Sequence, residues 1–441
     1  MTTLITPLTA WLARAGVESR INKTNTNNQV RVTWEKKEKQ TMNSITKLTL
    51  AAVALRRTRQ TNTVVSRFTI FFTVLLLAAT ATAQYKAVNL VADQPDARRD
   101  ADDRRRGQYK AVNLVADQPG VAKYQDSNIG DAWDIAELPN GGFAVANAWT
   151  GVLTFYSRDG RTMRSPITVP AAAGPGAVGS PSGLALNPTS NYVISKNGKS
   201  APAILLIATL DGLICGWNPA VDPDNAVIVI DNSTESPFPA GYDDLSFARD
   251  RDGNMVMYVT DGGQTLATAN NWIEIYDGNF HVLRRFTDAF APVAQTVYSA
   301  RPVDGKIYVT TAAFTKGQGG AVDVFDTEGN FLHRLSMNGP GGTLEAPFWV
   351  TRAPKHFGFA SDHLLVTNVE AGTISVFDDG GSFLGNLQDP SGQDIVLIGI
   401  WSSVFDHGDG KPKMFYSAGC DFPPDSPSLF GYVTIAAPQD K

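Results

Sequence analysis

Val322-Asp-Val-Phe-Asp326 is one of five copies of a pattern in which apolar and small or polar residues alternate, and an aromatic residue and a turn former end the run. The other copies are Val152-Leu-Thr-Phe-Tyr-Ser157, Leu213-Ile-Cys-Gly-Trp-Asn218, Ile273-Glu-Ile-Tyr-Asp277 and Ile374-Ser-Val-Phe-Asp378. Alternation with a period of two predicts a half-buried β-strand. Its regular return predicts a radial or stacked β architecture rather than a two-layer domain.

Each of these strands closes a larger unit that occurs six times between Trp133 and Phe430. The middle residues of the six expected innermost strands are Ile135, Leu184, Leu245, Val297, Val350 and Ser403, at intervals of 49, 61, 52, 53 and 53 residues. Units of this length hold four short strands and their loops. The sequence therefore predicts an all-β fold, a six-bladed β-propeller over residues 108–437.

A ring of blades has no free edge if a strand from one end of the chain completes the blade at the other end. Tyr109–Val115 is the natural closing strand. Residues 84–95 repeat residues 108–119 letter for letter, and a charge-dense linker of residues 96–107 separates the two copies. Only one copy can occupy one strand position, so Tyr85–Val91 is a spare strand or a competitor for that position. Arg104-Arg-Arg106 offers a processing site that would remove it.

The N-terminal part differs in composition from the rest. Residues 1–67 hold 12 Lys and Arg against 3 Asp and Glu and show no periodic pattern, so we expect a disordered basic leader or a translation start nearer Met42. Residues 68–83 carry no charge, and the apolar core from Phe68 to Ala79 is shorter than the roughly 20 residues that span a bilayer. We expect a signal peptide cleaved between Ala83 and Gln84, and hence a secreted protein with no stable membrane span.

The chain after the leader is acidic. Residues 84–441 hold 26 basic and 40 acidic residues, a formal charge of −14, which repels phosphate and argues against nucleic acid as a partner. The partners that remain are an extracellular small molecule, a carbohydrate or a protein, bound by a monomer. Cys215 and Cys420 are too few for a disulfide scaffold; two separate thiols are the preferred expectation, and a bridge stays open.

Several runs resemble an uncharacterised family of secreted six-bladed propellers, which is similar in turn to NHL-repeat and gluconolactonase-like propellers. They are Tyr109–Gly120, Ala132-Trp-Asp-Ile-Ala136, Gly198–Ala203, Asp211–Asp222, Tyr276–Phe280, Val324–Asn330 and Leu429-Phe-Gly431. The resemblance covers about residues 108–435 and implies the fold and export, because the family has no established activity. Asp134 and Ser402 stand where bacterial members often have Gly, and no sorting anchor follows Ala437, so we expect a released product.

Propellers usually bind ligands at the central channel or on the loops that enter it. The candidate ligand-binding residues are Asp134 and Asp244 on innermost strands, and Asn147, Asp261, Asn368 and Glu370 after second strands. Carboxylates and amides from several blades could hold a hard cation such as calcium, as the resemblance to gluconolactonase-like propellers implies. The alternative is that they bond their own backbone amides and keep strand edges soluble.

Other motifs give no catalytic constellation. The five histidines lack a metal-binding spacing, Gly198-Lys-Ser200 lacks the preceding Gly of a phosphate loop, and Asp250-Arg-Asp-Gly-Asn254 fits a hairpin turn better than a calcium loop. Asn232-Ser-Thr234 is a glycosylation sequon. The first hypothesis is therefore a non-enzymatic binding propeller. The alternative is a metal-dependent lactonase- or esterase-like hydrolase or lyase with a channel cation, and a structural matrix protein stays open.

Overall fold

The computed structural model describes residues 109–436 apart from 236–237, 264–269, 293, 314–316, 340, 407–409 and 420–425, and also the backbone of residues 17–22, 31–36 and 50–51. The chain divides into two compact units, Met1–Asp93 and Gln94–Lys441. In the first unit, β1 (Val17–Asn22), β2 (Arg31–Lys36) and β3 (Leu50–Ala51) pair antiparallel in that order. These strands differ from the sequence expectation, which found no regular structure in residues 1–67. The expected signal segment, the Ala83–Gln84 cleavage site and the first copy of the duplicated segment lie outside the described residues.

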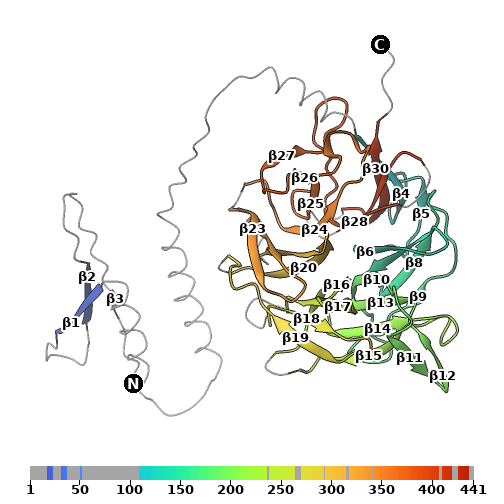
Figure 1. Ribbon diagram of the computed structural model, residues 1–441, viewed down its shortest axis with the longest axis horizontal. Coiled ribbons are helices and arrows are strands. Elements are labelled where there is room, and N and C mark those ends of the chain that lie inside the picture. Colours follow the sequence, from blue (N-terminus) through green and yellow to red (C-terminus); the bar gives the residue numbers. More distant parts are fainter. Residues whose placement is uncertain are drawn as a thin grey trace. The chain divides into compact units, whose positions relative to one another are not determined.

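In the second unit six sheets of four or five strands are arranged around one axis, as Figure 1 shows, and a separate two-stranded sheet lies in an insertion. Blade 1 contains β6 (Ala132–Glu137), β7 (Phe143–Asn147), β8 (Val152–Tyr156) and β9 (Ile167–Thr168); blade 2 contains β10 (Pro181–Leu186), β13 (Leu205–Thr209), β14 (Leu213–Trp217) and β15 (Val227–Asp231). Blade 3 contains β16 (Tyr242–Arg249), β17 (Met255–Asp261), β18 (Trp272–Tyr276) and β19 (Val282–Phe286); blade 4 contains β20 (Thr296–Val303), β21 (Lys306–Ala312), β22 (Gly320–Phe325) and β23 (Phe331–Asn338). Blade 5 contains β24 (Pro347–Arg352), β25 (Leu364–Asn368), β26 (Ile374–Phe377) and β27 (Phe383–Asn386). Blade 6 contains β28 (Ile400–Phe405), β29 (Lys413–Ala418), β30 (Leu429–Ile435), β4 (Tyr109–Ala116) and β5 (Tyr124–Gln125). The predicted six-bladed β-propeller is confirmed.

Two details refine the expected repeat. A hairpin of β11 (Val193–Lys196) and β12 (Lys199–Pro202) is inserted between β10 and β13, which accounts for the long second interval and places Gly198-Lys-Ser200 at a hairpin turn. The expected middle residue of the fourth innermost strand, Val297, is wrong by three positions. Ala300 pairs with Val309 as Ile135 pairs with Val145 in blade 1, and Val297 instead matches Ala132, because the bulge of β20 between Val297 and Ser299 lies at the same place as the bulge of β6 between Ala132 and Asp134.

The aromatic-Asp endings of the third strands form tight turns. Asp277 Oδ1 accepts the backbone N–H groups of Asn279 (2.8 Å) and His281 (2.9 Å), and the same contacts recur at Asp326 and Asp378. Such a carboxylate satisfies amides that the strand ladder leaves free, so the third strand stops there and the fourth begins. Asp250 makes the same contacts, and the hairpin-turn interpretation of residues 250–254 is therefore confirmed.

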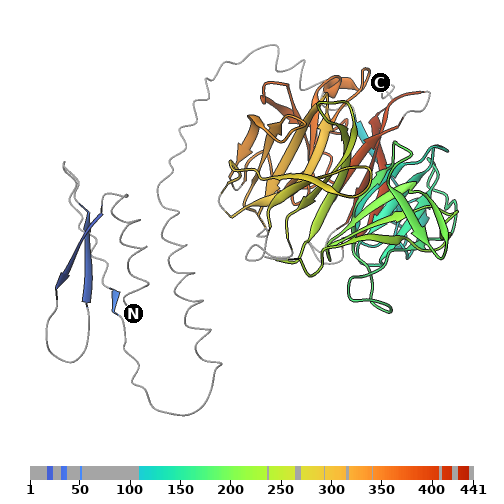
Figure 2. The same cartoon turned by 60° about the horizontal axis from the view of Figure 1, so that its bottom comes forward.

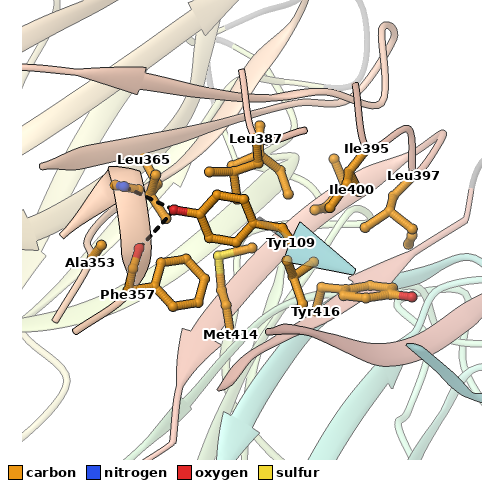
Figure 3. Packing of buried hydrophobic residues seen from close by; sticks show 14 of the residues in the cluster. Tyr109, Ala353, Phe357, Leu365, Leu387, Ile395, Leu397, Ile400, Met414 and Tyr416 are labelled. Carbon is orange, nitrogen blue, oxygen red and sulfur yellow. Dashed lines mark hydrogen bonds between the residues drawn. The ribbon is translucent and has the colours of Figure 1, made fainter. Parts of the chain in front are cut away.

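The ring is closed by β4, which pairs antiparallel with β30 from Ile435 opposite Tyr109 to Leu429 opposite Ala116. Figure 1 and Figure 2 show this strand, in teal, beside the red strands of blade 6. The buried Tyr109 hydroxyl donates to the carbonyl of Phe357 (2.7 Å) and accepts from the N–H of Ala360 (2.9 Å), which ties β4 to blade 5 (Figure 3). The predicted closing strand thus joins the first and last parts of the propeller.

Hydroxyl groups on the second strands tie neighbouring blades together. At one matched position of blades 3 to 6, a buried Thr or Ser donates to a carbonyl on the innermost strand of the next blade. The pairs are Thr260 with Tyr298 (3.1 Å), Thr310 with Phe348 (3.0 Å), Thr367 with Trp401 (3.2 Å) and Ser417 with Trp133 (3.0 Å). We call these four residues the hydroxyl ties. Blades 1 and 2 have Ala146 and Ala208 there, and use Asp134 and Ser182 on their innermost strands instead.

We predict that Thr367→Val lowers the free energy of unfolding by about 2 kcal/mol, because the isosteric change leaves both the Trp349 N–H and the Trp401 carbonyl without their partner. Urea denaturation measures this change. Thr351→Val, on the half-buried part of β24, is the matched control and should stay within about 0.5 kcal/mol of the wild type. Equal effects of the two substitutions would contradict the role given to the hydroxyl ties.

Candidate functional site

Asp134 and Asp244 lie at matched positions beside the bulges of β6 and β16, as the sequence predicts. Asp134 accepts the N–H of Ile135 through Oδ1 (2.7 Å) and that of Leu184, in blade 2, through Oδ2 (2.7 Å). Asp244 accepts the N–H of Leu245 through Oδ1 (2.8 Å) and that of Ala300, in blade 4, through Oδ2 (3.2 Å). Each carboxylate therefore bonds the channel-side edge of its own innermost strand and of the next one.

The two carboxyl groups also affect one another. Burial raises the pKa of Asp134 well above its usual value, and the charge of Asp244 raises it further. Burial raises the pKa of Asp244 as well, while the guanidinium of Arg301 opposes that shift. Arg301 donates to Asp244 Oδ1 (3.0 Å) and lies 3.3 Å above the ring of Trp349. Asp134, Asp244 and Arg301, which come from blades 1, 3 and 4, thus form one electrostatically interacting group.

Asn147, Asp261 and Asn368 are the last residues of β7, β17 and β25, in alternate blades. Each side-chain oxygen accepts a backbone N–H from the loop that leads into the innermost strand of the same blade: Gly130 (3.3 Å), Gly241 (3.0 Å) and Glu345 (3.1 Å). The structure therefore does not bring these three residues to one point, and each fastens a separate loop. Glu370, in the turn after β25, accepts the N–H of Gly317 from blade 4 (2.5 Å).

In every blade the innermost strand begins opposite the end of the second strand, and we call this end of the ring the loop face. An aromatic cluster of Trp133, Tyr298, Phe348 and Trp401 lies there. Trp133 and Trp401 stack with ring centroids 3.9 Å apart, and Phe348 contacts both rings edge-on. Because these residues come from four consecutive blades, 4, 5, 6 and 1, packed rings surround much of the axis at the loop face.

Two carboxylates at the edge of the aromatic cluster were missed as candidates. Asp131 accepts the indole N–H of Trp133 (2.7 Å). Asp243 occupies the bulge of β16, where blade 1 has Trp133, and burial followed by the charge of Asp261 raises its pKa well above the usual value. The alignment of repeats on the bulge rather than on the strand centre would have found both the cluster and Asp243.

The remaining expectations concern metals, thiols and glycans. No group of three or more His, Cys, Asp or Glu side chains that could hold a metal ion occurs among the described residues. Cys215 is a buried free thiol, and Cys420 lies outside the described part of the chain. The amide nitrogen of Asn232, which would carry a glycan, donates to the hydroxyl of Tyr242 (2.7 Å), so glycosylation requires that this bond open. No helix in the described ranges is long and apolar enough to cross a membrane.

No family model matches the sequence. The chain is similar to two uncharacterized proteins of Acanthamoeba polyphaga mimivirus. One is 30% identical over 256 residues, which are 54% of this chain and 45% of that protein, and the other is 25% identical over 315 residues, which are 68% and 74%. The chain thus spans less than half the length of the first relative.

Solved structures similar to this chain include a gluconolactonase from Xanthomonas campestris, with 14% identity, coverage of 76% of this chain and 92% of that chain, and a TM-score of 0.46. A virginiamycin B lyase from Staphylococcus aureus shows 11% identity, coverage of 74% and 99%, and a TM-score of 0.40.

We expect Asp134→Ala to lower the free energy of unfolding by about 3 kcal/mol, since the buried N–H of Leu184 loses its acceptor. The loss should be the same with and without added calcium. The control is Asp224→Ala, an exposed carboxylate on the loop before β15, which should have little effect. A calcium-dependent stabilisation present in the wild type and absent in Asp134→Ala would instead make Asp134 a metal ligand.

Asp261 predicts a pH dependence of stability. Burial raises its pKa to about 6 in the folded chain, compared with about 3.9 in an unfolded chain. The folded state therefore holds a proton at Asp261 that the unfolded state releases earlier, and this contribution to stability is lost as the pH rises from 4 through 6. Relative to Asp261→Asn, the wild type should lose about 2 kcal/mol of unfolding free energy between pH 4 and pH 7.5. Urea denaturation of both proteins at each pH measures this difference. Equal changes in their free energies of unfolding with pH would contradict the assignment to Asp261.

Proposed function

We propose that the protein is a secreted binding module that engages an extracellular small molecule, carbohydrate or protein through its loop face. The observation that carries the proposal is that the carboxylates of Asp134 and Asp244 are already hydrogen-bonded to the backbone. Asp134 and Asp244 each bond two backbone N–H groups, so a ligand or cation at the axis would have to replace bonds that hold the innermost strands. Binding at the rim requires no such exchange.

An exposed apolar pair at the loop face supports this location. Trp149, in the turn after β7, is 48% exposed, and Val178, in the loop before β10, is 62% exposed. Val178 lies against Gly151 in the turn that carries Trp149, because a Cβ on Gly151 would meet its Cγ1 at 2.8 Å. An exposed Trp offers a large rigid contact surface, and Trp residues are enriched among the residues that dominate binding energy.

The export of the protein follows from the leader. A basic region, a short apolar core and the Ala81-Thr-Ala83 sequence support secretion, and the acidic body favours neutral or basic partners over nucleic acid. A monomer suffices for binding of this kind, since one ring presents a complete loop face.

The second candidate is a metal-dependent lactonase- or esterase-like hydrolase or lyase. The pair of Asp243 and Asp261 favours it, because each is buried and the charge of Asp261 raises the pKa of Asp243. A hard cation such as calcium would relieve that repulsion and could polarise a carbonyl group. In the described ranges no group of three or more His, Cys, Asp or Glu side chains includes this pair, so further oxygen ligands of a calcium ion would have to be of other kinds.

The test compares Trp149→Ala/Val178→Ser with Ile228→Ser, which alters an exposed apolar residue on the outer strand of blade 2. The probes are immobilised chitin, cellulose, xylan and pectin, together with purified extracellular proteins. We predict that a probe bound by the wild type loses affinity by tenfold or more in the double variant and is bound normally by the control. Calcium-dependent hydrolysis of a lactone or ester that is lost in Asp243→Asn, with no effect of the Trp149 variant, would support the second candidate instead.

A further inference from the structure

Residues 287–292 follow β19 of blade 3 and are fastened to the two outer strands of blade 4 by buried charged groups. Asp288 Oδ1 accepts the N–H of Phe290 (2.9 Å), and the carbonyl of Phe290 accepts from the guanidinium of Arg334 on β23. The same guanidinium donates to both carboxylate oxygens of Asp323 on β22 (2.8 and 2.7 Å). Asp288 is 4% exposed and Asp323 is fully buried. The two carboxyl groups and the guanidinium form the Asp288 cluster.

One oxygen atom of the Asp288 cluster has no donor. Asp288 Oδ2 is buried and accepts no hydrogen bond in the described part of the chain, and the side chain of Asp288 lies within hydrogen-bonding reach of Asp323. Two carboxylates make such a contact only if one of them carries a proton, since both are otherwise acceptors of like charge. Burial, followed by the contact with Asp323, raises the pKa of Asp288 to about 7. The carboxyl group of Asp288 is therefore the donor.

Blade 3 contains a matched pair of residues. Glu274 lies opposite Arg285 in the register of β18 and β19, at the positions that Asp323 and Arg334 occupy in β22 and β23. Arg285 donates to Glu274 Oε1 (2.6 Å), and two tyrosine hydroxyl groups donate to Oε2. The buried carboxylate of blade 3 thus receives its remaining protons from hydroxyl groups.

These two tyrosines have no counterpart in blade 4. They are Tyr242 and Tyr276, and the strand registers place Val297 and Phe325 at their positions, where neither side chain can donate. The carboxyl group of Asp288 takes their place. Burial raises the pKa of both tyrosines, so their hydroxyl groups keep their protons throughout the neutral range, whereas Asp288 loses its proton there. Only the attachment in blade 4 therefore responds to pH.

The charged surroundings of Asp288 come from blade 4. Asp323 is the only charged residue of β22, and Arg334 opposes the charge of Asp323 at Asp288. His333 precedes Arg334 on β23 and points to the other face of the sheet, because side chains alternate along a strand. The arginines of β19 pair with other carboxylates. The pairs are Arg284 with Glu328, and Arg285 with Glu274 and Glu235.

We propose that residues 287–292 form a latch that is held closed by a proton shared between Asp288 and Asp323. In the closed state the carboxyl group of Asp288 donates to the carboxylate of Asp323, and the segment lies on blade 4. Once that proton passes to water, two buried carboxylates face a single guanidinium, and their repulsion favours release of the segment. Release separates Phe290 from Phe331, whose ring centroids lie 4.0 Å apart, and uncovers the ring of Phe331.

The direction of the pH effect follows from the two states of the latch. In the released segment Asp288 is in water and has the ordinary aspartate pKa of about 3.9, whereas its pKa is about 7 in the closed latch. The closed state thus holds a proton that the released state has already lost between these two values. The equilibrium constant for release should increase by about tenfold per pH unit between pH 4 and pH 7 and then level off, because above pH 7 both states are unprotonated.

Amide hydrogen exchange at Phe290 measures release, because Asp288 accepts its N–H group. Protection factors correct for the intrinsic effect of pH on exchange, and in the wild type the factor for Phe290 should fall by at least about thirtyfold between pH 5 and pH 7.5. The internal control is the N–H of Glu328, which Asp326 Oδ1 accepts in the same way (2.9 Å). Its protection should change by less than about threefold.

Asp288→Asn provides the decisive comparison. The asparagine side chain still accepts the N–H of Phe290 and offers Asp323 a donor that does not titrate, so protection of Phe290 should stay at its pH 5 level up to pH 7.5. The control variant is Asp224→Asn, which alters an exposed carboxylate and should keep the wild-type pH dependence. Constant protection of Phe290 in the wild type, or an equal fall in the wild type and Asp288→Asn, would overturn the proposal.

Discussion

Every blade of the ring has one strand whose outer edge pairs with its sheet and whose inner edge faces the axis without a strand partner. The backbone N–H and carbonyl groups on that inner edge need partners, because buried polar groups left unpaired are costly. This protein supplies them from the next blade. Carboxylates take the N–H groups in blades 1 and 3, and hydroxyl groups take carbonyls at the other blade boundaries. Each boundary in the ring therefore has at least one buried side-chain tie, and the blades stabilise one another in a closed cycle.

Because of that constraint, the residues that hold the ring together differ from the residues that are available to bind a ligand. Asp134 and Asp244 on the innermost strands are bonded to backbone, and the aromatic cluster takes residues from four of the six blades at the loop face. Side chains available to a ligand lie farther out, on turns such as the one that carries Trp149. Asn147 and Asp261 fasten the loops that lead into their innermost strands, so the ring holds the loops that a ligand would contact. The same division explains how propellers with similar rings serve different functions.

Much of the fold could be predicted from local pattern. Strands of period two, an aromatic residue followed by Asp, Asn or Ser at the end of five of them, and near-equal spacing were sufficient for the blade number and the closing strand. The position of Val297 was predicted wrongly because Val297 is the large aliphatic residue of Thr296-Val-Tyr-Ser-Ala300, whereas the small Ala300 occupies the position that matches Ile135. That match depends on the pairing of β20 with β21, which local composition does not fix.

The site was harder to predict for the same reason. Asp134 and Asp244 were found as matched positions, but their bonds to Leu184 and Ala300 depend on blade packing, and the sequence could not distinguish a ligand-binding carboxylate from a tie. The aromatic cluster was missed because its members align on the bulge and are flanked by different residues in each blade. Asp131 and Asp243 were recognised as candidates only because the structure places them next to the aromatic cluster.

Amide hydrogen exchange at Leu184 and Ala300 tests the central claim most directly. Both N–H groups lie on strand edges that face the channel, and both are held by a carboxylate of another blade. The account predicts protection comparable to that of Val259 in the interior of blade 3, with exchange only when the ring opens. Exchange at the rate of Leu283, on the exposed outer strand β19, would show that the ties do not hold the ring together.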